Sequence, residues 1–324
     1  MEENTEQRLD LTLFSEKIQE LKERIASVVV GQEQTVDLVL TAVLANGHVL
    51  IEGVPGVAKT LLARLTARLI DADFSRIQFT PDLMPSDVLG TTVFNMKTNG
   101  FDFHQGPIFA DIVLVDEINR APAKTQAALF EVMEERQISI DGTTHRMGDL
   151  YTILATQNPV EQEGTYKLPE AQLDRFLMKI TMDYPSLEEE VNILERHHTN
   201  AALVKLDDIV PAITKEELLS LRAFMNQVFV DRTLLQYIAL IVQQTRTSKA
   251  VYLGASPRAS VAMLQSSKAY ALLQGRDFVT PEDIKFVAPY VLQHRLILTA
   301  EAEMEGYSPV KVTQRLIDKV EVPK

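Results

Sequence analysis

The sequence contains no cysteine, which excludes disulfide bonds, thiolate nucleophiles and zinc sites built on cysteine. It also contains no apolar run near the ~18 residues that a membrane-spanning helix needs, so we expect no membrane span. Basic residues are outnumbered, with 32 Lys and Arg against 45 Asp and Glu, and the formal net charge is −13. This balance argues against a broad basic face for nucleic acid, although a local channel could still be basic.

The bulk composition is typical of a soluble globular protein. Hydrophobic residues make up 46% of the 324 residues and charged residues make up 24%. Residues 1–6 are acidic and polar, unlike the start of a signal peptide. We therefore expect a cytoplasmic protein, with about two domains at ~150 residues per domain.

A glycine-rich segment between a predicted strand and a predicted helix organises the chain. The apolar residues 49–51 come just before it, and a helical pattern follows it. Glycines let the backbone turn sharply and bring its N–H groups close to an anion, and the next helix adds the positive end of its dipole. The sequence therefore predicts a phosphate-binding loop formed by Gly53, Val54, Pro55, Gly56, Val57, Ala58, Lys59, Thr60 and Leu61.

Two side chains of this loop have specific predicted roles. Lys59 can reach the terminal phosphates, and the Thr60 hydroxyl can ligate Mg²⁺. The segment departs at one position from the pattern G-x-x-x-x-G-K-[ST], because Ala58 stands where the second glycine is expected. A methyl group is compatible with that position if the backbone is already helical, since only a positive φ favours glycine.

A second stretch places two acids at the end of a strand. Residues 112–115 are four apolar residues in a row, which predicts a strand buried on both faces, as in a parallel sheet. Asp116 and Glu117 follow, at the carboxyl edge where open α/β sheets bind ligands. We expect Asp116 to hold the Mg²⁺ shell and Glu117 to orient and deprotonate the attacking water. The alternative is that both acids only cap the next helix.

Another predicted strand, at residues 150–156, ends in polar residues at the same sheet edge. Asn158 could hold the attacking water or the γ-phosphate there, or it could cap a turn. Two hairpins are also predicted, one around Asn99-Gly100 and one around Asp141-Gly142. We expect the first hairpin to be an insertion whose phenylalanines, Phe94, Phe101 and Phe103, are packing residues rather than substrate contacts.

The chain changes character near Pro185. Nearly every later periodic segment predicts helix, with no convincing strand, so we expect an α/β part at residues 1–184 and a helical part at residues 185–324. Arg258 falls in the first turn of a predicted helix, where the helix dipole disfavours a cation. This local misfit suggests a contact with a phosphate across a cleft, and the alternative is a solvated arginine.

As a set, these motifs resemble those of AAA+ ATPases, and their exact sequences resemble those of the MoxR family. The resemblance rests on Gly-Val-Pro-Gly-Val-Ala-Lys-Thr at 53–60, Val-Asp-Glu-Ile-Asn-Arg-Ala at 115–121, Ala-Thr-Gln-Asn-Pro at 155–159 and Glu-Ala-Gln-Leu-Asp-Arg-Phe at 170–176. Alanine at position 58 is usual in that family. The resemblance implies a AAA+ P-loop core with a parallel sheet and two hairpin insertions, followed by an all-α lid domain.

The resemblance also implies roles for single residues. It places ATP or ADP on the loop with Mg²⁺ as cofactor, and it places Gly31 and Gln32 at the adenine. Asn158 resembles the sensor that positions water, and Arg258 resembles the sensor arginine of the lid. Arg175 resembles an arginine finger, which acts in a neighbouring subunit's site. The resemblance therefore implies a ring, most often a hexamer, in which ATP binding and loss rock the lid against the core.

For function, the resemblance implies an ATP-driven, chaperone-like protein that remodels, matures or activates a client protein, with a von Willebrand factor A domain protein as partner. One alternative is a nucleic-acid motor of the helicase-related clade, although the hairpins offer only Lys97, His145 and Arg146 as basic groups. A metal-chelatase-like ATPase subunit is another. A nucleotide switch without turnover is a third, and the intact Glu117 argues against it.

Overall fold

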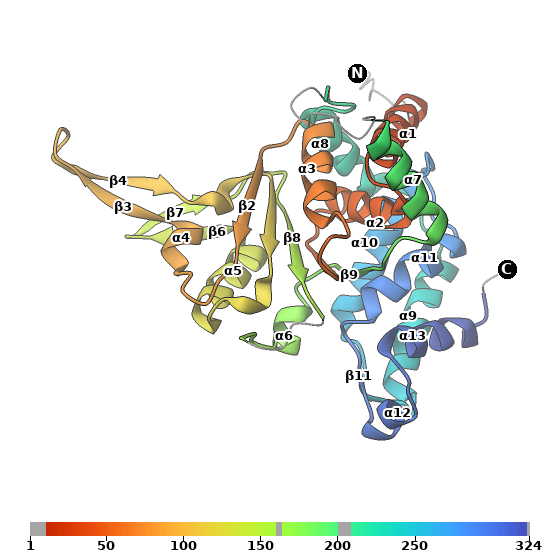
Figure 1. Cartoon of the computed structure of the whole chain (residues 1–324). Coiled ribbons are helices and arrows are strands. Elements are labelled where there is room, and N and C mark those ends of the chain that lie inside the picture. Colours follow the sequence, from red (N-terminus) through yellow and green to blue (C-terminus); the bar gives the residue numbers. More distant parts are fainter. Residues whose placement is uncertain (1–10, 160–163, 200–208, 323–324) are drawn as a thin grey trace, which may run out of the picture.

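The computed structural model of the protein describes residues 11–159, 164–199 and 209–322. The first part is built on a five-stranded sheet with the strand order β2-β5-β8-β1-β9 (Figure 1). Every adjacent pair is parallel, so all five carboxyl ends lie at one edge and the predicted parallel sheet is confirmed. The strands are β1 (Val49–Gly53), β2 (Phe74–Gln78), β5 (Ile112–Asp116), β8 (Thr152–Gln157) and β9 (Met178–Met182).

Both faces of β5 are buried, as its apolar run predicts. Successive residues of β5 point to opposite faces, so Ile112 and Leu114 belong to one buried cluster and Val113 and Val115 to another. The first cluster includes residues of α1 (Leu11–Ala26), α2 (Glu33–Leu44) and α3 (Lys59–Leu69). The second includes residues of α4 (Pro85–Leu89) and α5 (Ala123–Glu135).

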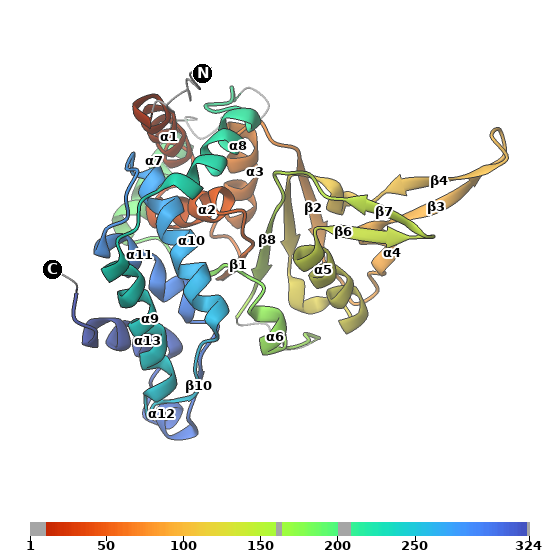
Figure 2. The ribbon, with the colours of Figure 1, turned by 180° about the vertical axis from the view of Figure 1, so that it is seen from behind.

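Two antiparallel hairpins interrupt the alternation of strands and helices. They are formed by β3 (Gly90–Asn95) with β4 (Gly100–Gln105), and by β6 (Gln137–Ile140) with β7 (Thr143–Arg146). Asp141 and Gly142 have φ values of 52° and 80°, which fits the tight turn predicted between β6 and β7. The β3–β4 hairpin is longer, and it projects away from the body of the molecule (Figures 1 and 2).

The phenylalanines of the β3–β4 hairpin divide into two groups. The ring of Phe103 packs against Phe109 and against His145 of β7, with centroid distances of 5.9 and 4.3 Å. Phe94 and Phe101 contact each other, but they are 48% and 72% exposed. The predicted packing role is therefore confirmed for Phe103 and wrong for Phe94 and Phe101, because their part of the hairpin extends into solvent.

The second part of the chain is mainly helical. Two short strands, β10 (Val251–Leu253) and β11 (Ile297–Leu298), pair antiparallel, so the expectation of no strand is wrong. Strands of three and two residues are too short to show alternation in a sequence. The helices after the core are α7 (Leu187–His198), α8 (Lys215–Phe224), α9 (Arg232–Thr247), α10 (Pro257–Leu273), α11 (Pro281–Leu292), α12 (Ala300–Met304) and α13 (Pro309–Lys319).

The helical part packs beside the sheet, next to α2 and α3 (Figures 1 and 2). One buried cluster runs from Ile51 of β1 to Ile238 of α9 and Val287 of α11. The predicted boundary at residue 184 falls between β9 and α7, and it stays a prediction because the core is continuous across it. Within the described ranges, no helix combines the length and the hydrophobicity that a bilayer crossing requires.

Candidate functional site

Three of the predicted motifs meet at the carboxyl edge of the sheet. β1 ends at Gly53 and α3 begins at Lys59, so the glycine-rich loop leaves the sheet at this edge. β5 ends at Asp116, and β8, which lies between β1 and β5, ends just before Asn158. The structure therefore brings the loop, the two acids and Asn158 to neighbouring strand ends.

The loop has the shape and the charge that a phosphate requires. The Lys59 ammonium donates to the backbone oxygens of Gly53 and Val54, at 2.5 and 2.9 Å. Burial lowers the pKa of Lys59, while Asp116 and Glu117 act in the opposite direction, so both acids lie within electrostatic reach of it. Gly56 has a φ of 92°, and a Cβ there would meet no atom within 4 Å. This open loop with one cation fits a phosphate.

Ala58 adopts a conformation that the sequence did not predict. Its φ and ψ are 63° and 22°, in the left-handed region, and helix α3 begins only at the next residue. The condition under which a methyl group would be unstrained, a helical backbone, is therefore not met. An L-residue in this region costs roughly 1–2 kcal/mol, which the rest of the loop must offset.

Asp116 is nearly buried, and both of its carboxylate oxygens have partners. Its side chain is 9% exposed, and its Oδ2 lies 2.6 Å from Nε of Arg76. Its Oδ1 accepts from the Thr156 hydroxyl at 3.0 Å, and that hydroxyl oxygen in turn accepts from the Glu117 N–H at 3.1 Å. Carboxylate and hydroxyl oxygens are Mg²⁺ ligands, so Asp116 and Thr60, in the first turn of α3, fit this ion.

Glu117 is held in a strained conformation beside Asp116. Its φ and ψ are 57° and 50°, which is unusual for a residue other than glycine and is typical of functional sites. Its Oε2 accepts from Nε2 of Gln78 at 2.8 Å and lies 3.1 Å from Nε of Arg120. A water oriented by Glu117 would have to compete with these two donors.

The sequence reasoning missed Arg76 and Gln78, which both lie on β2. They are two residues apart, so their side chains lie on the same face of the strand. Gln78 is paired in register with Asp116, because β2 is the neighbour of β5. The signal was present as two polar residues at alternate positions, but it could be used only once the order of the strands was known.

The remaining predicted residues of this edge lie near the start of α7. Gly31 has a φ of 72°, and a Cβ there would come within 2.4 to 2.8 Å of the Glu189 carboxyl group of α7. Gln32 precedes α2, and its Oε1 accepts from the Thr35 hydroxyl at 2.9 Å. α7 follows the carboxyl end of β9, the neighbour of β1, so Gly31 and Gln32 border the same edge.

Arg175 lies at the opposite edge of the sheet. The N–H of Leu177 donates to the carbonyl of His48, the residue just before β1, at 2.8 Å. This contact places Arg175 at the amino ends of β1 and β9, whereas the loop lies at the carboxyl ends. A strand of five residues, such as β1, is roughly 16 Å long.

Arg258 lies beside Arg175, and the two arginines share one carboxylate. Nη2 of Arg258 is 3.0 Å from Oε1 of Glu134 at the end of α5, and Nη1 of Arg175 is 3.7 Å from Oε2 of the same residue. Arg175 also donates to the carbonyl of Phe130 at 2.7 Å. The structure therefore groups the two predicted arginines and separates both from Lys59. Glu134 was not predicted, because no local pattern marks it.

Comparisons with known proteins show the family of the chain. Residues 48–178 match the ATPase family associated with various cellular activities (AAA), and residues 243–318 match the AAA lid domain. A Bacillus subtilis protein named YeaC is 48% identical over 93% of this chain and 93% of its own length. The Mycobacterium tuberculosis chaperone MoxR1 is 44% identical over 93% of this chain and 81% of its own length. A solved structure of a Cytophaga hutchinsonii protein has a TM-score of 0.88 and 41% identity, covering 97% of each chain.

Proposed function

Because the chain belongs to the MoxR family of AAA+ ATPases, we propose that it hydrolyses ATP in a ring of identical subunits to remodel, mature or activate partner proteins. The observation that carries this proposal is the placement of the charged groups. Lys59, Asp116 and Glu117 lie at the carboxyl edge of the sheet, whereas Arg175 and Arg258 lie together at the amino edge.

Within one subunit, the carboxyl edge supplies most of what phosphoryl transfer needs. The loop N–H groups and Lys59 bind the β- and γ-phosphates, and Gly31 and Gln32 border the adenine. Thr60 and Asp116 would hold Mg²⁺, which would neutralise charge on the phosphate oxygens. Glu117 orients the attacking water and takes its proton, and Asn158 fixes the position of that water.

The charge that develops on the transferred phosphoryl group is stabilised by cations in addition to Lys59. Arg175 and Arg258 cannot supply them to their own loop from the opposite edge of the sheet. A second copy stacked head to tail would bring both arginines to the loop of its neighbour. This arrangement supports a ring, which we take to be a hexamer.

Two variants and their mixture test this proposal. We expect Glu117→Gln to bind ATP but to hydrolyse it at least ~100-fold more slowly, since it removes the general base. Arg175→Ala should cause a similar loss, because one catalytic arginine is worth a factor of ~10³ or more. In a 1:1 mixture, about one quarter of the sites would combine an intact Glu117 with an intact neighbouring Arg175. Steady-state hydrolysis should recover accordingly, and no recovery would reject action between subunits.

The client and its partner can be sought with the Glu117→Gln variant. The tip of the β3–β4 hairpin exposes Val93, Phe94, Met96 and Phe101, which suits an apolar segment of a protein better than a phosphate backbone. We expect Glu117→Gln with ATP to retain a client protein and a von Willebrand factor A domain partner in a pull-down. Tight binding of single- or double-stranded DNA at physiological salt would favour the nucleic-acid motor instead.

A further inference from the structure

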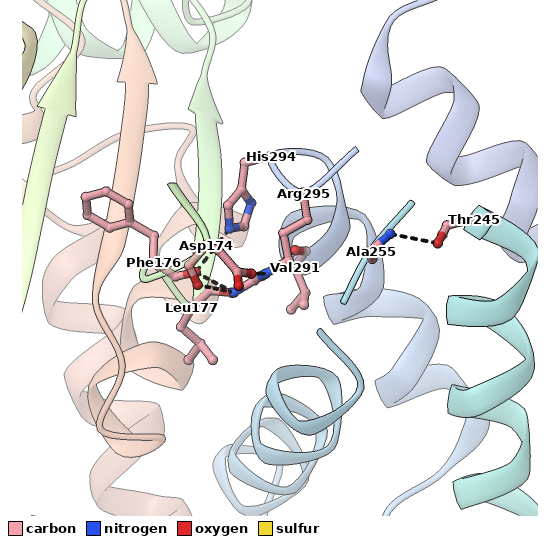
Figure 3. A network of polar contacts seen from close by, with 8 residues as sticks. All are labelled: Asp174, Phe176, Leu177, Thr245, Ala255, Val291, His294 and Arg295. Atoms are coloured by element: carbon pink, nitrogen blue, oxygen red, sulfur yellow. Dashed lines mark hydrogen bonds and ion pairs between the residues drawn. The ribbon is translucent and has the colours of Figure 1, made fainter. Parts of the chain in front are cut away.

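Arg295 joins the lid to the core segment that contains Arg175. It follows α11, and its side chain is only 4% exposed. Figure 3 shows its guanidinium directed at Asp174, Phe176 and Leu177. Nε donates to Oδ1 of Asp174 at 2.7 Å, and Nη2 donates to the carbonyls of Asp174 and Phe176 at 3.1 and 2.7 Å. Nη1 donates to the carbonyls of Leu177, at 3.2 Å, and Val291.

These five hydrogen bonds use the entire donor capacity of the guanidinium. Four of them end on residues that flank Arg175 on both sides. A buried guanidinium is costly unless all of its donors are paired, so a shift of this segment relative to α11 would leave donors unpaired. The contact therefore fixes the backbone on either side of Arg175.

Residues next to Arg295 strengthen the attachment. Burial lowers the pKa of His294, which is therefore neutral, and its Nε2 lies 3.0 Å from the carbonyl of Phe176. Nε2 of Gln293 donates to the carbonyl of Lys179 at 2.5 Å, at the start of β9. Three successive lid residues thus bind the backbone between residues 174 and 179.

The segment that carries Arg258 is fixed within the lid in a similar way. The N–H of Ala255 donates to the Thr245 hydroxyl at 3.0 Å, and both residues are buried (Figure 3). The carbonyl of Ala255 accepts from Nε of Arg246 at 2.9 Å. Arg258 follows three residues later in the first turn of α10. The backbones of both arginines are therefore tied to the same lid.

We propose that Arg295 is a positioning residue for Arg175. It holds Arg175 beside Arg258, at the orientation in which both meet the phosphates bound by the neighbouring subunit. It also makes that orientation depend on the position of the lid. This inference rests on the proposed function, because it requires that Arg175 acts between subunits.

The test is Arg295→Gln, alone and mixed with Glu117→Gln. We expect the homogeneous variant to bind ATP normally at its own loop and to hydrolyse it roughly 10- to 100-fold more slowly, since displacing a catalytic group by ~1 Å can cost about 100-fold. The effect should fall on kcat, with KM for ATP changed less than ~3-fold. Mixing with Glu117→Gln should restore hydrolysis, because those subunits supply a correctly held Arg175. A general folding defect would not be restored in this way.

Two further variants control for stability. Arg276 pairs with both oxygens of Asp283 inside the lid, at 2.8 and 2.5 Å, and Arg276→Gln should lower the melting temperature without the loss in kcat. Asp174→Asn removes the negative charge that faces Arg295 and leaves the backbone carbonyl acceptors in place. If Arg295→Gln does not fold, Asp174→Asn should show the same recovery on mixing, from a smaller initial loss.

Two outcomes would overturn the inference and separate it from the proposed function. If Arg295→Gln and Asp174→Asn hydrolyse ATP at the wild-type rate, Arg295 does not position Arg175. The same conclusion holds if Arg295→Gln fails to recover with Glu117→Gln while Arg175→Ala does recover with it. If Arg175→Ala also fails to recover, the proposed action between subunits is wrong and the inference is rejected with it.

Discussion

Nη2 of Arg258 lies 3.0 Å from Oε1 of Glu134, so an arginine of the lid is ion-paired with the end of a core helix. Arg258 is 62% exposed, and pairs as accessible as this one contribute little to stability. The ion pair instead orients the side chains, because Arg258 and Arg175 both point toward the Glu134 carboxylate. Under the proposed function, that carboxylate faces the phosphates of the next subunit.

We expect Glu134→Gln to change the free energy of unfolding by less than about 1 kcal/mol. It should lower KM for ATP by about two- to fivefold, because phosphate oxygens no longer compete with a carboxylate for the two arginines. Initial-rate kinetics would measure this change. Glu131→Gln, an exposed acid on the same helix, is the matched control. A fall in turnover as large as that of Arg175→Ala would contradict this expectation and show that Glu134 is required to orient the two arginines for catalysis.

The carboxyl-edge site could be predicted because its signals are local. The run from Ile112 to Val115 predicted a strand buried on both faces. Because the two acids follow this strand in the sequence, they had to lie at its carboxyl end. The glycine-rich loop could be predicted in the same way, apart from the conformation of Ala58. A residue's φ depends on how the whole loop closes, which a single alanine does not reveal.

The amino-edge cluster could not be predicted in the same way. Glu134 and Arg258 are 124 residues apart, and Asp174 and Arg295 are 121 residues apart. Contacts of this kind depend on how the lid packs against the core, and no periodicity records them. Arg258 alone left a local signal, as a cation in the first turn of a helix. The structure pairs it with Glu134, and the phosphate contact inferred from that signal stays a prediction.

Gly56→Ala separates backbone strain from steric clash in the phosphate loop. A Cβ at Gly56 meets no atom within 4 Å, so any effect comes from its φ of 92°. We expect the variant to lose roughly 1–2 kcal/mol of unfolding free energy, measured by denaturant titration. The reverse change, Ala58→Gly, should be neutral or stabilising by up to ~1 kcal/mol, since it relieves strain at φ 63°. A destabilised Ala58→Gly would show that its methyl group contributes more by packing than it costs.

Arg76→Ala should alter the response to Mg²⁺. Its Nε is 2.6 Å from Oδ2 of Asp116, the carboxylate that is expected to hold the ion. Removing this competing charge should strengthen the effect of Mg²⁺ on ADP affinity by about three- to tenfold, since a unit charge a few ångströms away is worth about 1 kcal/mol near water. Calorimetric titrations of ADP with and without Mg²⁺ would measure it.

The control for this change is Arg315→Gln on α13, where the guanidinium lies 4.5 Å from the ring centroid of Tyr307. This variant should bind ADP like the wild type with or without Mg²⁺. Equal Mg²⁺ dependence in Arg76→Ala and the wild type would mean that Arg76 and the ion do not compete for Asp116.

Buried histidines should make the protein less stable in acid. Burial and Arg136 lower the pKa of His48 from 6.5 to about 3, whereas an unfolded chain takes up the proton near pH 6.5. The unfolded state therefore binds more protons between these values, and stability falls as the pH drops from about 6.5 to about 3. The slope is at most ~1.4 kcal/mol per pH unit for one histidine.

Urea unfolding of the wild type and of His48→Asn at several pH values would test this expectation. The gap between the two unfolding free energies should narrow as the pH falls, because only the wild type loses this contribution. His104→Asn, at an exposed position on β4, is the matched substitution control. Parallel curves for the wild type and His48→Asn would contradict the assignment.

The separation of Lys59 and Arg175 across the sheet gives each subunit a direction. If arginines serve the next copy, a two-fold symmetric pair cannot complete either site, because matching patches would face each other. A linear row always leaves one terminal loop without arginines, whereas a closed circle leaves none. Dilution should open rings, and each break should inactivate one site. Specific activity should therefore fall as the protein concentration is lowered.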